Sequence, residues 1–197
     1  MKRIDLSPSS IMLLQFEEII DILTQNYQKH PDSYFSECEL QYELYRLLKS
    51  SKKFDLSSDT NSGKNVGIIH PEYPSVNRVQ LSRGKGYRVW FDIAILNPDF
   101  IKNNSYQTVL ARDERDAKLW GENLLAVFEF KFFPKKFKNH INSVKEDCLK
   151  LSLCPEIKNR YVLVFSSYAP VLSELKADKP SDVKLYWITP DKVEKLF

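Results

Sequence analysis

The stretch LLAVFEFKFF, residues 124–133, decides the fold predicted for this chain. It is apolar except at Glu129 and Lys131, which is typical of a strand buried inside a sheet. Side chains alternate between the two faces of a strand, so Glu129 and Lys131 point the same way and the intervening phenylalanines point into a core. Two charges on one face of a buried strand require partners.

A second strand-like run, YRVWFDIAIL over residues 87–96, carries one acid in its middle. Aspartate is a poor strand former and is rarely buried alone, so Asp92 requires a cation or a hydrogen-bond donor. If this strand pairs with the strand at 124–133, Asp92, Glu129 and Lys131 converge on one place.

Helical and strand patterns alternate around these two runs. Apolar periodicity predicts helices over 9–28, 37–51, 141–153 and 171–177, and strands over 66–73, 161–166 and 183–189. Because the later strands alternate with helices, the predicted fold class is α/β, a mixed central sheet flanked by helices. We expect one domain over 1–197, with residues 1–35 as an N-terminal helical extension.

The composition is that of a soluble globular protein. Of the 197 residues, 43% are hydrophobic and 28% charged, and no apolar run approaches the roughly 20 residues that cross a bilayer. The three cysteines form no CxxC pair, and acids interrupt the N-terminal apolar segment too early for a secretory signal. These features predict a cytoplasmic protein with no membrane partner. A net charge of +3 neither demands nor excludes nucleic acid.

An acid-x-Lys triplet has little meaning alone, since it occurs five times. The triplets are Asp116–Lys118, Glu129–Lys131, Glu156–Lys158, Glu174–Lys176 and Asp182–Lys184. Only Glu129–Lys131 lies inside a strongly apolar strand. Context therefore selects this triplet as the candidate site.

The chemistry of these residues points to a metal ion. The carboxylates of Asp92 and Glu129, with the backbone carbonyl of Phe130, are oxygen ligands of the kind Mg²⁺ or Mn²⁺ prefers. Such a metal polarises a phosphoryl oxygen and lowers the pKa of bound water. Lys131 would then orient that water or stabilise negative charge in the transition state.

The order of these motifs resembles the PD-(D/E)XK, or restriction-endonuclease-like, nuclease superfamily. The resemblance rests on an acidic helix, an Asp in a strand, a (D/E)-x-K in the next strand, and a following helix and strand. The matching segments are 36–41, Asp92, Glu129–Lys131, the helix with Lys145, Asp147 and Lys150, and 161–165. It implies Mg²⁺-dependent hydrolysis of phosphodiester bonds, with endonuclease action favoured over exonuclease action.

Two departures from that pattern affect the assignment. No proline precedes Asp92, and the nearby Pro98–Asp99 pair follows the strand, where it is expected to start a turn. Asp92 is therefore the favoured metal ligand. The long separation between Asp92 and Glu129 requires an insertion between core strands, assigned to residues 97–122.

Three acids on the helix at 37–51 compete for the remaining catalytic position. Glu37 lies three, seven and ten positions before Leu40, Leu44 and Leu47, so it shares their inward face and is favoured. Glu39 is suited to cap the helix with Ser36. Glu43 stays open. Glu72, on a neighbouring strand, is predicted to be a surface acid.

Two basic runs near the candidate site are candidates for phosphate contacts. They comprise Arg78, Arg83, Lys85 and Arg88, and then Lys135, Lys136 and Lys138. Such contacts supply affinity for nucleic acid that does not depend on sequence. Ordinary solvated loops are the equally weighted alternative.

Three functions follow from these observations. The first is a metal-dependent nuclease with DNA as the expected substrate. The second is a nucleic-acid-binding or assembly domain of the same fold that has lost turnover. The third is an α/β interaction module with a structural ion pair on its sheet. RNA as the substrate and a homodimeric assembly stay open.

Overall fold

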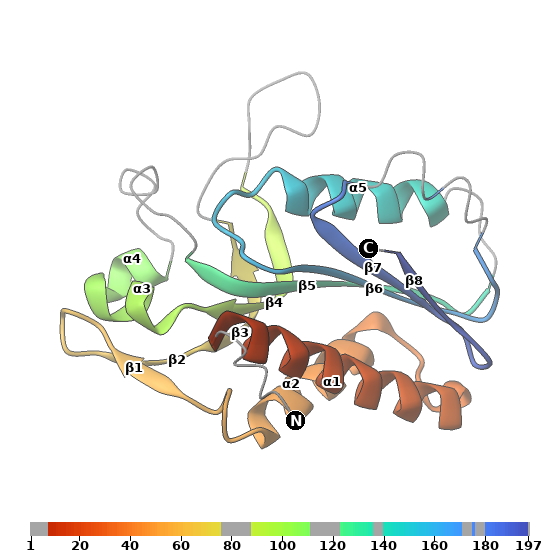
Figure 1. Cartoon of the computed structure of the whole chain (residues 1–197), viewed down its shortest axis with the longest axis horizontal. Coiled ribbons are helices and arrows are strands. Elements are labelled where there is room, and N and C mark those ends of the chain that lie inside the picture. The colour runs from red at the N-terminus through yellow and green to blue at the C-terminus, as the bar shows by residue number, and fades with distance from the viewer. Residues whose placement is uncertain are drawn as a thin grey trace, which may run out of the picture.

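One six-stranded sheet runs through the protein, with helices on both of its faces (Figure 1). The computed structural model describes residues 8–75, 88–110, 123–135, 140–170, 175 and 180–196, with side chains from residue 14 onward. The strands of the main sheet are β3 (Ile69–Pro74), β4 (Trp90–Leu96), β5 (Leu124–Phe133), β6 (Arg160–Ser166), β7 (Val183–Ile188) and β8 (Val193–Leu196). The predicted α/β class with a mixed sheet is confirmed.

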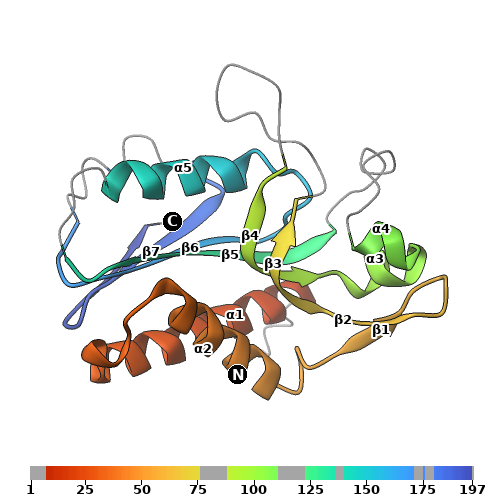
Figure 2. The ribbon, with the colours of Figure 1, turned by 180° about the vertical axis from the view of Figure 1, so that it is seen from behind.

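The strands follow one another in space in the order of the sequence, with both orientations present. Strands β3, β4 and β5 are mutually antiparallel, β5, β6 and β7 are parallel, and β8 returns antiparallel to β7. A parallel pair needs a crossover connection, and α5 (His140–Ser152) provides it between β5 and β6. Helix α5 therefore covers one face of the sheet, as Figure 2 shows from behind.

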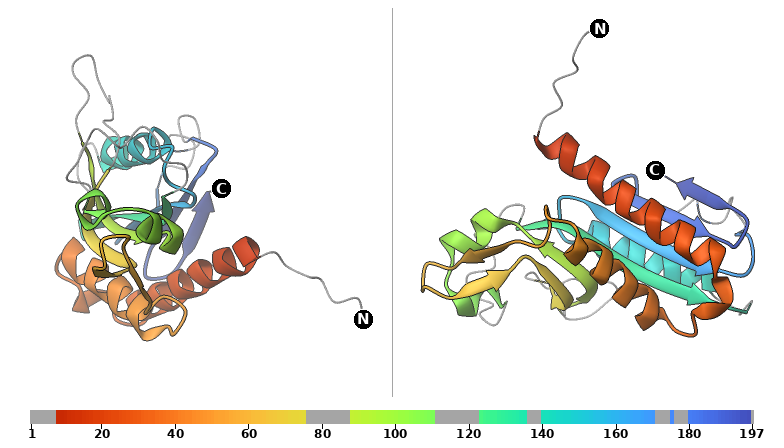
Figure 3. Two further views of the ribbon diagram at one scale, coloured as in Figure 1. Left: turned by 90° about the vertical axis from the view of Figure 1, so that its left-hand side faces the viewer. Right: turned by 90° about the horizontal axis from the view of Figure 1, so that it is seen from below.

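The opposite face is covered by α1 (Pro8–Lys29) and α2 (Glu37–Ser50), as the right-hand view of Figure 3 shows. Phe16 of α1 is fully buried, stacks on Phe54 at a ring separation of 4.8 Å, and meets Phe128 of β5 edge-on at 6.0 Å. These aromatic contacts make α1 part of the core. Between the two helices lies the short 3₁₀ helix η1 (Pro31–Ser33).

The start of α2 is fixed by its first residues. Glu39 accepts a hydrogen bond from the backbone N–H of Ser36 at 3.0 Å, which is the carboxylate half of a capping box. Leu40, Leu44 and Leu48 are fully buried along one side of the helix. The cap and this apolar side together set the rotation of α2, and so the direction of Glu37 in its first turn.

Strand β4 leaves β5 part-way along its length. Their pairing ends at Ile93↔Phe128, although β4 continues to Trp90 and β5 to Phe133. Beyond that point β4 stays with β3, through Tyr73↔Phe91 and Pro74↔Trp90. The second half of β5 therefore has one edge without a neighbouring strand among the described residues.

The segment 66–73, predicted as one strand, is two. Strand β2 (Asn65–Gly67) pairs with β1 (Ser57–Asp59) in a separate small sheet, whereas β3 joins the main sheet. Ile68 lies at the change: it donates to Leu56 O at 3.1 Å and accepts from Leu96 N at 2.8 Å. The chain switches from one sheet to the other there, directly after Gly67, with no proline at the change.

The stretch between β4 and β5 begins with two short helices, α3 (Pro98–Asn103) and α4 (Tyr106–Val109). Residues 111–122 lie outside the described part. The predicted helix at 171–177 is described only at the buried Leu175. In the described residues, no helix is long and apolar enough to cross a membrane.

We predict that Phe16→Ala lowers the free energy of unfolding by about 3–5 kcal/mol, the usual cost of removing a buried phenylalanine. Equilibrium urea unfolding measures this change. Leu14, on the same helix but 53% exposed, provides the control. Leu14→Ala should stay within about 0.5 kcal/mol of the parent. Equal effects of the two substitutions would contradict the placement of α1 in the core.

Candidate functional site

Two carboxylates lie along the open edge of β5. Asp92 Oδ2 accepts a hydrogen bond from Phe130 N at 2.7 Å, and Glu37 Oε2 accepts one from Phe132 N at 3.2 Å. In a strand, the N–H and C=O of one residue point to the same edge, and alternate residues share it. The carbonyl of Phe130 therefore faces this opening too.

The face of β5 toward α5 carries the charged pair predicted from the sequence. Lys150 Nζ lies 2.6 Å from Glu129 Oε2, and Lys131 Nζ lies 2.8 Å from Asp147 Oδ2. Asp147 Oδ1 also lies 3.3 Å from Lys150 Nζ. Two acids and two lysines thus form a continuous ion-pair network between β5 and α5.

The divergence of β4 and β5 connects the two faces of the sheet at this point. Glu37 belongs to α2, which packs on the face opposite α5, yet its Oε1 lies 4.0 Å from Lys131 Nζ. Lys131 Nζ also donates to the carbonyl of Phe130 at 3.0 Å. Residues from α2, β4, β5 and α5 therefore meet in one cluster, defined here as Glu37, Asp92, Glu129, Lys131, Asp147 and Lys150 and called the charged cluster.

Burial works against the negative charge of this cluster. It raises the pKa of Glu129, whose residue is only 2% exposed, well above the ordinary value, and the Lys150 ammonium offsets this only in part. Burial also raises the pKa of Asp92 against the opposing effect of the Phe130 N–H. For Glu37, burial raises the pKa and the Lys131 ammonium works in the other direction.

The two lysines of the cluster keep their charge, because neighbouring acids raise their pKa values. Burial opposes the charge of Lys131, but Asp147 and Glu37 outweigh it and raise the pKa of Lys131 to about 12. Burial opposes the charge of Lys150 as well, and Glu129 and Asp147 raise its pKa overall. Both ammonium groups therefore remain protonated at neutral pH.

All four residues predicted as catalytic lie in the charged cluster: Glu37, Asp92, Glu129 and Lys131. Of the competing helix acids, Glu39 caps α2, while Glu43 accepts from Asn26 at 2.9 Å and pairs with Arg46 at 2.9 Å.

The other two acids considered lie outside the cluster. Asp99 is exposed and lies in the first turn of α3, so the Pro98–Asp99 pair begins a helix after the strand and not the predicted turn. Glu72 is exposed, as expected for a surface acid, and it has a left-handed backbone with φ 50°.

Of the basic residues predicted to contact nucleic acid, two are described. Arg88 precedes β4 and is half-buried, and Lys135 follows β5 and is exposed. Arg78, Arg83, Lys85, Lys136 and Lys138 lie outside the described residues.

Sequence reasoning did not assign Asp147 and Lys150 to the site. A signal was present: Asp147 lies three positions after Val144 and four before Leu151, so it shares the buried side of α5. Lys150 follows at the i+3 spacing that brings two side chains together on a helix. Their ion pairs with Glu129 and Lys131 connect α5 to the sheet.

The oxygen atoms of the charged cluster are of the type that a hard divalent cation prefers. Glu129 Oε1 is buried and has no hydrogen-bond partner among the described residues, while its other oxygen binds Lys150. Asp92 Oδ2 and Phe130 O face the same opening from neighbouring strands. In the described part of the chain, no three or more His, Cys, Asp or Glu side chains already form a metal-ligating group. Lysine ammonium groups separate the acids instead.

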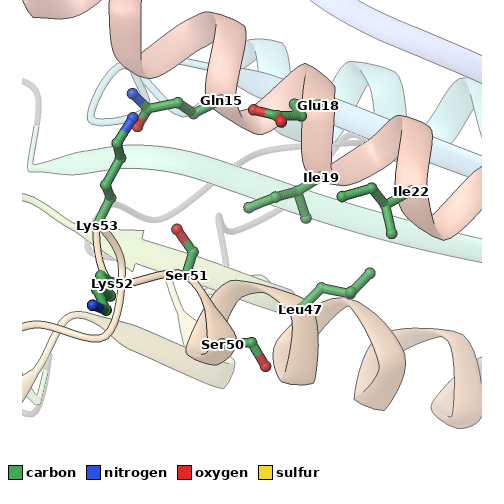
Figure 4. Close-up of a pocket in the computed structure, with 9 residues that line it drawn as sticks. All are labelled: Gln15, Glu18, Ile19, Ile22, Leu47, Ser50, Ser51, Lys52 and Lys53. Carbon is green, nitrogen blue, oxygen red and sulfur yellow. The ribbon is translucent and has the colours of Figure 1, made fainter.

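One pocket of about 440 Å³ lies away from this chemistry, between α1 and the end of α2, where Ile19, Ile22 and Leu47 line it beside Lys52 and Lys53 (Figure 4). It includes no member of the charged cluster and no buried ionisable group.

In comparisons with known proteins, no protein-family model, curated protein or solved structure matches the chain. Functional reasoning therefore depends on the chemistry of the charged cluster itself.

We predict that Lys150→Met destabilises the protein by about 3–5 kcal/mol near pH 8, because it leaves the buried Glu129 carboxylate without its partner. The pKa of Glu129 is raised, so its neutral form dominates as the pH falls through that pKa. The penalty for the unpaired charge should therefore shrink toward about pH 5. Urea unfolding at both pH values measures it.

The control is Lys49→Met, which removes an exposed partner of Asp55 with side chains 39% and 55% accessible. Exposed ion pairs contribute about 0–1 kcal/mol, so this substitution should have little effect at either pH. A Lys150→Met penalty that does not change with pH would argue against charge on Glu129 as its origin.

Proposed function

We propose that this protein is a metal-dependent nuclease of the PD-(D/E)XK type, with Mg²⁺ or Mn²⁺ as its cofactor and DNA as its expected substrate. The observation that carries the proposal is the convergence of Asp92, Glu129 and Lys131 at the divergence of β4 and β5. A mixed sheet with helices on both faces is compatible with a restriction-endonuclease-like core. Glu37 completes the set of acids that the resemblance implies.

The balance of charge supports a divalent ion. Four carboxylates and two ammonium groups make up the charged cluster, so two negative charges remain when all six groups are ionised. Buried surplus charge is unfavourable without a counter-ion. One divalent cation neutralises it. We assign Asp92, Glu129 and the carbonyl of Phe130 as its ligands.

A bound Mg²⁺ or Mn²⁺ supplies Lewis-acid polarisation of a phosphoryl oxygen and a lowered pKa for a coordinated water. Lys131 has a pKa of about 12, so it acts as a hydrogen-bond donor and a fixed positive charge rather than as a general base. Its ammonium orients the attacking water or stabilises charge on the phosphate. Asp147, 2.8 Å from Lys131 Nζ, positions that ammonium.

Glu37 has a role that follows from its two contacts. Its Oε2 accepts from Phe132 N, and its Oε1 lies 4.0 Å from Lys131 Nζ. Glu37 therefore fixes the open edge of β5 and holds the lysine toward the opening. We infer that Glu37 positions Lys131 for the reaction.

A structural role for the ion pairs is the second candidate, and one contact favours it. Lys150 Nζ lies 2.6 Å from Glu129 Oε2, so a cation already neutralises one oxygen of the acid assigned to the metal. Under this alternative, divalent ions leave the melting temperature unchanged and no phosphodiester is cleaved.

The nuclease proposal predicts cleavage of plasmid or single-stranded DNA that requires Mg²⁺ or Mn²⁺ and stops in EDTA. Asp92→Asn and Lys131→Ala should each lower the rate by about 100-fold or more, because each removes a ligand or a charge-stabilising group. Gel assays of initial rates measure this. Metal-dependent cleavage that survives both substitutions would reject the site assignment.

The helix acids allow a matched comparison. Glu37→Gln should lower the cleavage rate by about 10-fold or more, since it removes a group that holds Lys131. Glu43→Gln changes the same residue type on the same helix, outside the charged cluster, and should keep the parent rate. A larger loss of cleavage rate in Glu43→Gln than in Glu37→Gln would contradict the role given to Glu37.

Metal binding should strengthen with pH. The pKa values of Glu129 and Asp92 are raised, so protons occupy these carboxyls at lower pH and must be displaced by the ion. Each displaced proton should weaken metal stabilisation by up to about 1.4 kcal/mol per pH unit below the raised pKa. Thermal unfolding with and without Mn²⁺, at about pH 6 and about pH 8, tests this.

Glu129→Gln is the control for that titration, because its amide holds no proton to displace. It should weaken the metal-induced rise in melting temperature and flatten its dependence on pH. A rise that is as large at the lower pH as at the higher one would contradict the assignment of these carboxyls as ligands.

A further inference from the structure

Trp90 is an exposed aromatic residue beside the charged cluster. Its side chain is 58% exposed although it belongs to a strand of the main sheet. Side chains alternate along a strand, so Trp90 lies on the same face of β4 as Asp92, two residues away. Lys150 Nζ, which pairs with Glu129, also donates to the carbonyl of Trp90 at 3.3 Å. Trp90 thus borders the site proposed to bind the scissile phosphate.

A pocket of about 390 Å³ opens at Trp90, large enough for a small ligand group. The residues that line it include Trp90, the part-buried His70 and the exposed Glu72, together with Arg88 and the buried Tyr73. The rings of His70 and Tyr73 are 5.6 Å apart. The exposed ring of Trp90 beside the polar side chains of His70 and Glu72 makes a surface for a flat group that has polar edges.

The position of this pocket beside the proposed phosphate site favours a nucleobase as the flat group. A nucleic acid whose phosphate lies at the charged cluster places its neighbouring bases within reach of the adjacent strand. Aromatic side chains bind bases by stacking, and every base offers a π face. In a duplex, bases are already stacked on one another, so only an unpaired base can lie on Trp90.

We propose that Trp90 and the pocket beside it form a subsite for one unpaired nucleobase next to the scissile phosphate. The nuclease therefore prefers single-stranded or locally unpaired nucleic acid over intact duplex. The preference for unpaired substrates rests on the proposed function. Base binding by Trp90 has a readout that does not depend on cleavage.

The test moves a single abasic residue along a single-stranded DNA oligonucleotide, with Mn²⁺ and the full chain. An abasic residue removes one base and keeps its phosphate. Cleavage should fall by about 10-fold at one phosphate near each abasic position, the loss expected for one stacked base. Trp90→Ala should cut slowly and lose this dependence, whereas Trp90→Phe keeps an aromatic face and should retain it. A matching duplex should be cut more slowly.

A second measurement follows binding alone. A base stacked on indole quenches its fluorescence, so the same oligonucleotide, added in EDTA, should quench the parent protein. Trp90→Phe assigns the signal, because the chain also contains Trp120 and Trp187. The quenching component should be absent in that variant. Single-stranded RNA in parallel reports whether the sugar matters.

The outcomes separate the two proposals. Quenching through Trp90 without cleavage of any substrate supports the base subsite and rejects the nuclease. Cleavage that is insensitive to abasic residues, with no quenching through Trp90, overturns the subsite and leaves the nuclease. Absence of both cleavage and quenching rejects both.

Discussion

The candidate site depends on one hydrogen bond, in which a side-chain carboxylate replaces the neighbouring strand as the partner of a backbone N–H. Where β4 leaves β5, the N–H of Phe130 would lose its strand partner, and Asp92 Oδ2 takes that position at 2.7 Å. A buried backbone donor without a partner is strongly disfavoured, so this contact permits the divergence. Glu37 does the same for Phe132. The acids that stabilise the open edge are thereby the acids that face the opening.

The other constraint is the burial of Glu129. A carboxylate that is 2% exposed needs a cation, and Lys131 on the same face of β5 pairs with Asp147 instead. Helix α5 supplies Lys150 to Glu129 and Asp147 to Lys131. The charged cluster therefore requires α5 in one position along β5, and the crossover that makes β5 and β6 parallel also completes the site.

The sequence was enough to predict β5 and the side of α2 that carries Glu37, because both depend on patterns within a single segment. The run from 124 to 133 coincides with β5, and the phase of Leu40 and Leu44 gave Glu37 the correct side of α2. The divergence of β4 from β5 could not be predicted, because YRVWFDIAIL reads as one uninterrupted strand. For the same reason the switch of sheets at Ile68 was missed. Asp147 was not assigned to the site because a charged residue on a helix is normally solvated. Only its position between Val144 and Leu151 indicated that it is buried.

The charged cluster has four carboxylates but only two ammonium groups, and this surplus of acids is unfavourable in a partly buried site. Lys150 binds one oxygen of Glu129 and leaves Oε1 without a hydrogen bond, so the neutralisation is incomplete. Burial raises the carboxyl pKa values of Glu37, Asp92 and Glu129, and the neighbouring lysines offset this only in part. A purely structural ion-pair network would be more stable with fewer acids or with an apolar replacement. Retaining more buried carboxylates than ammonium groups has a physical rationale if a further cation binds among them.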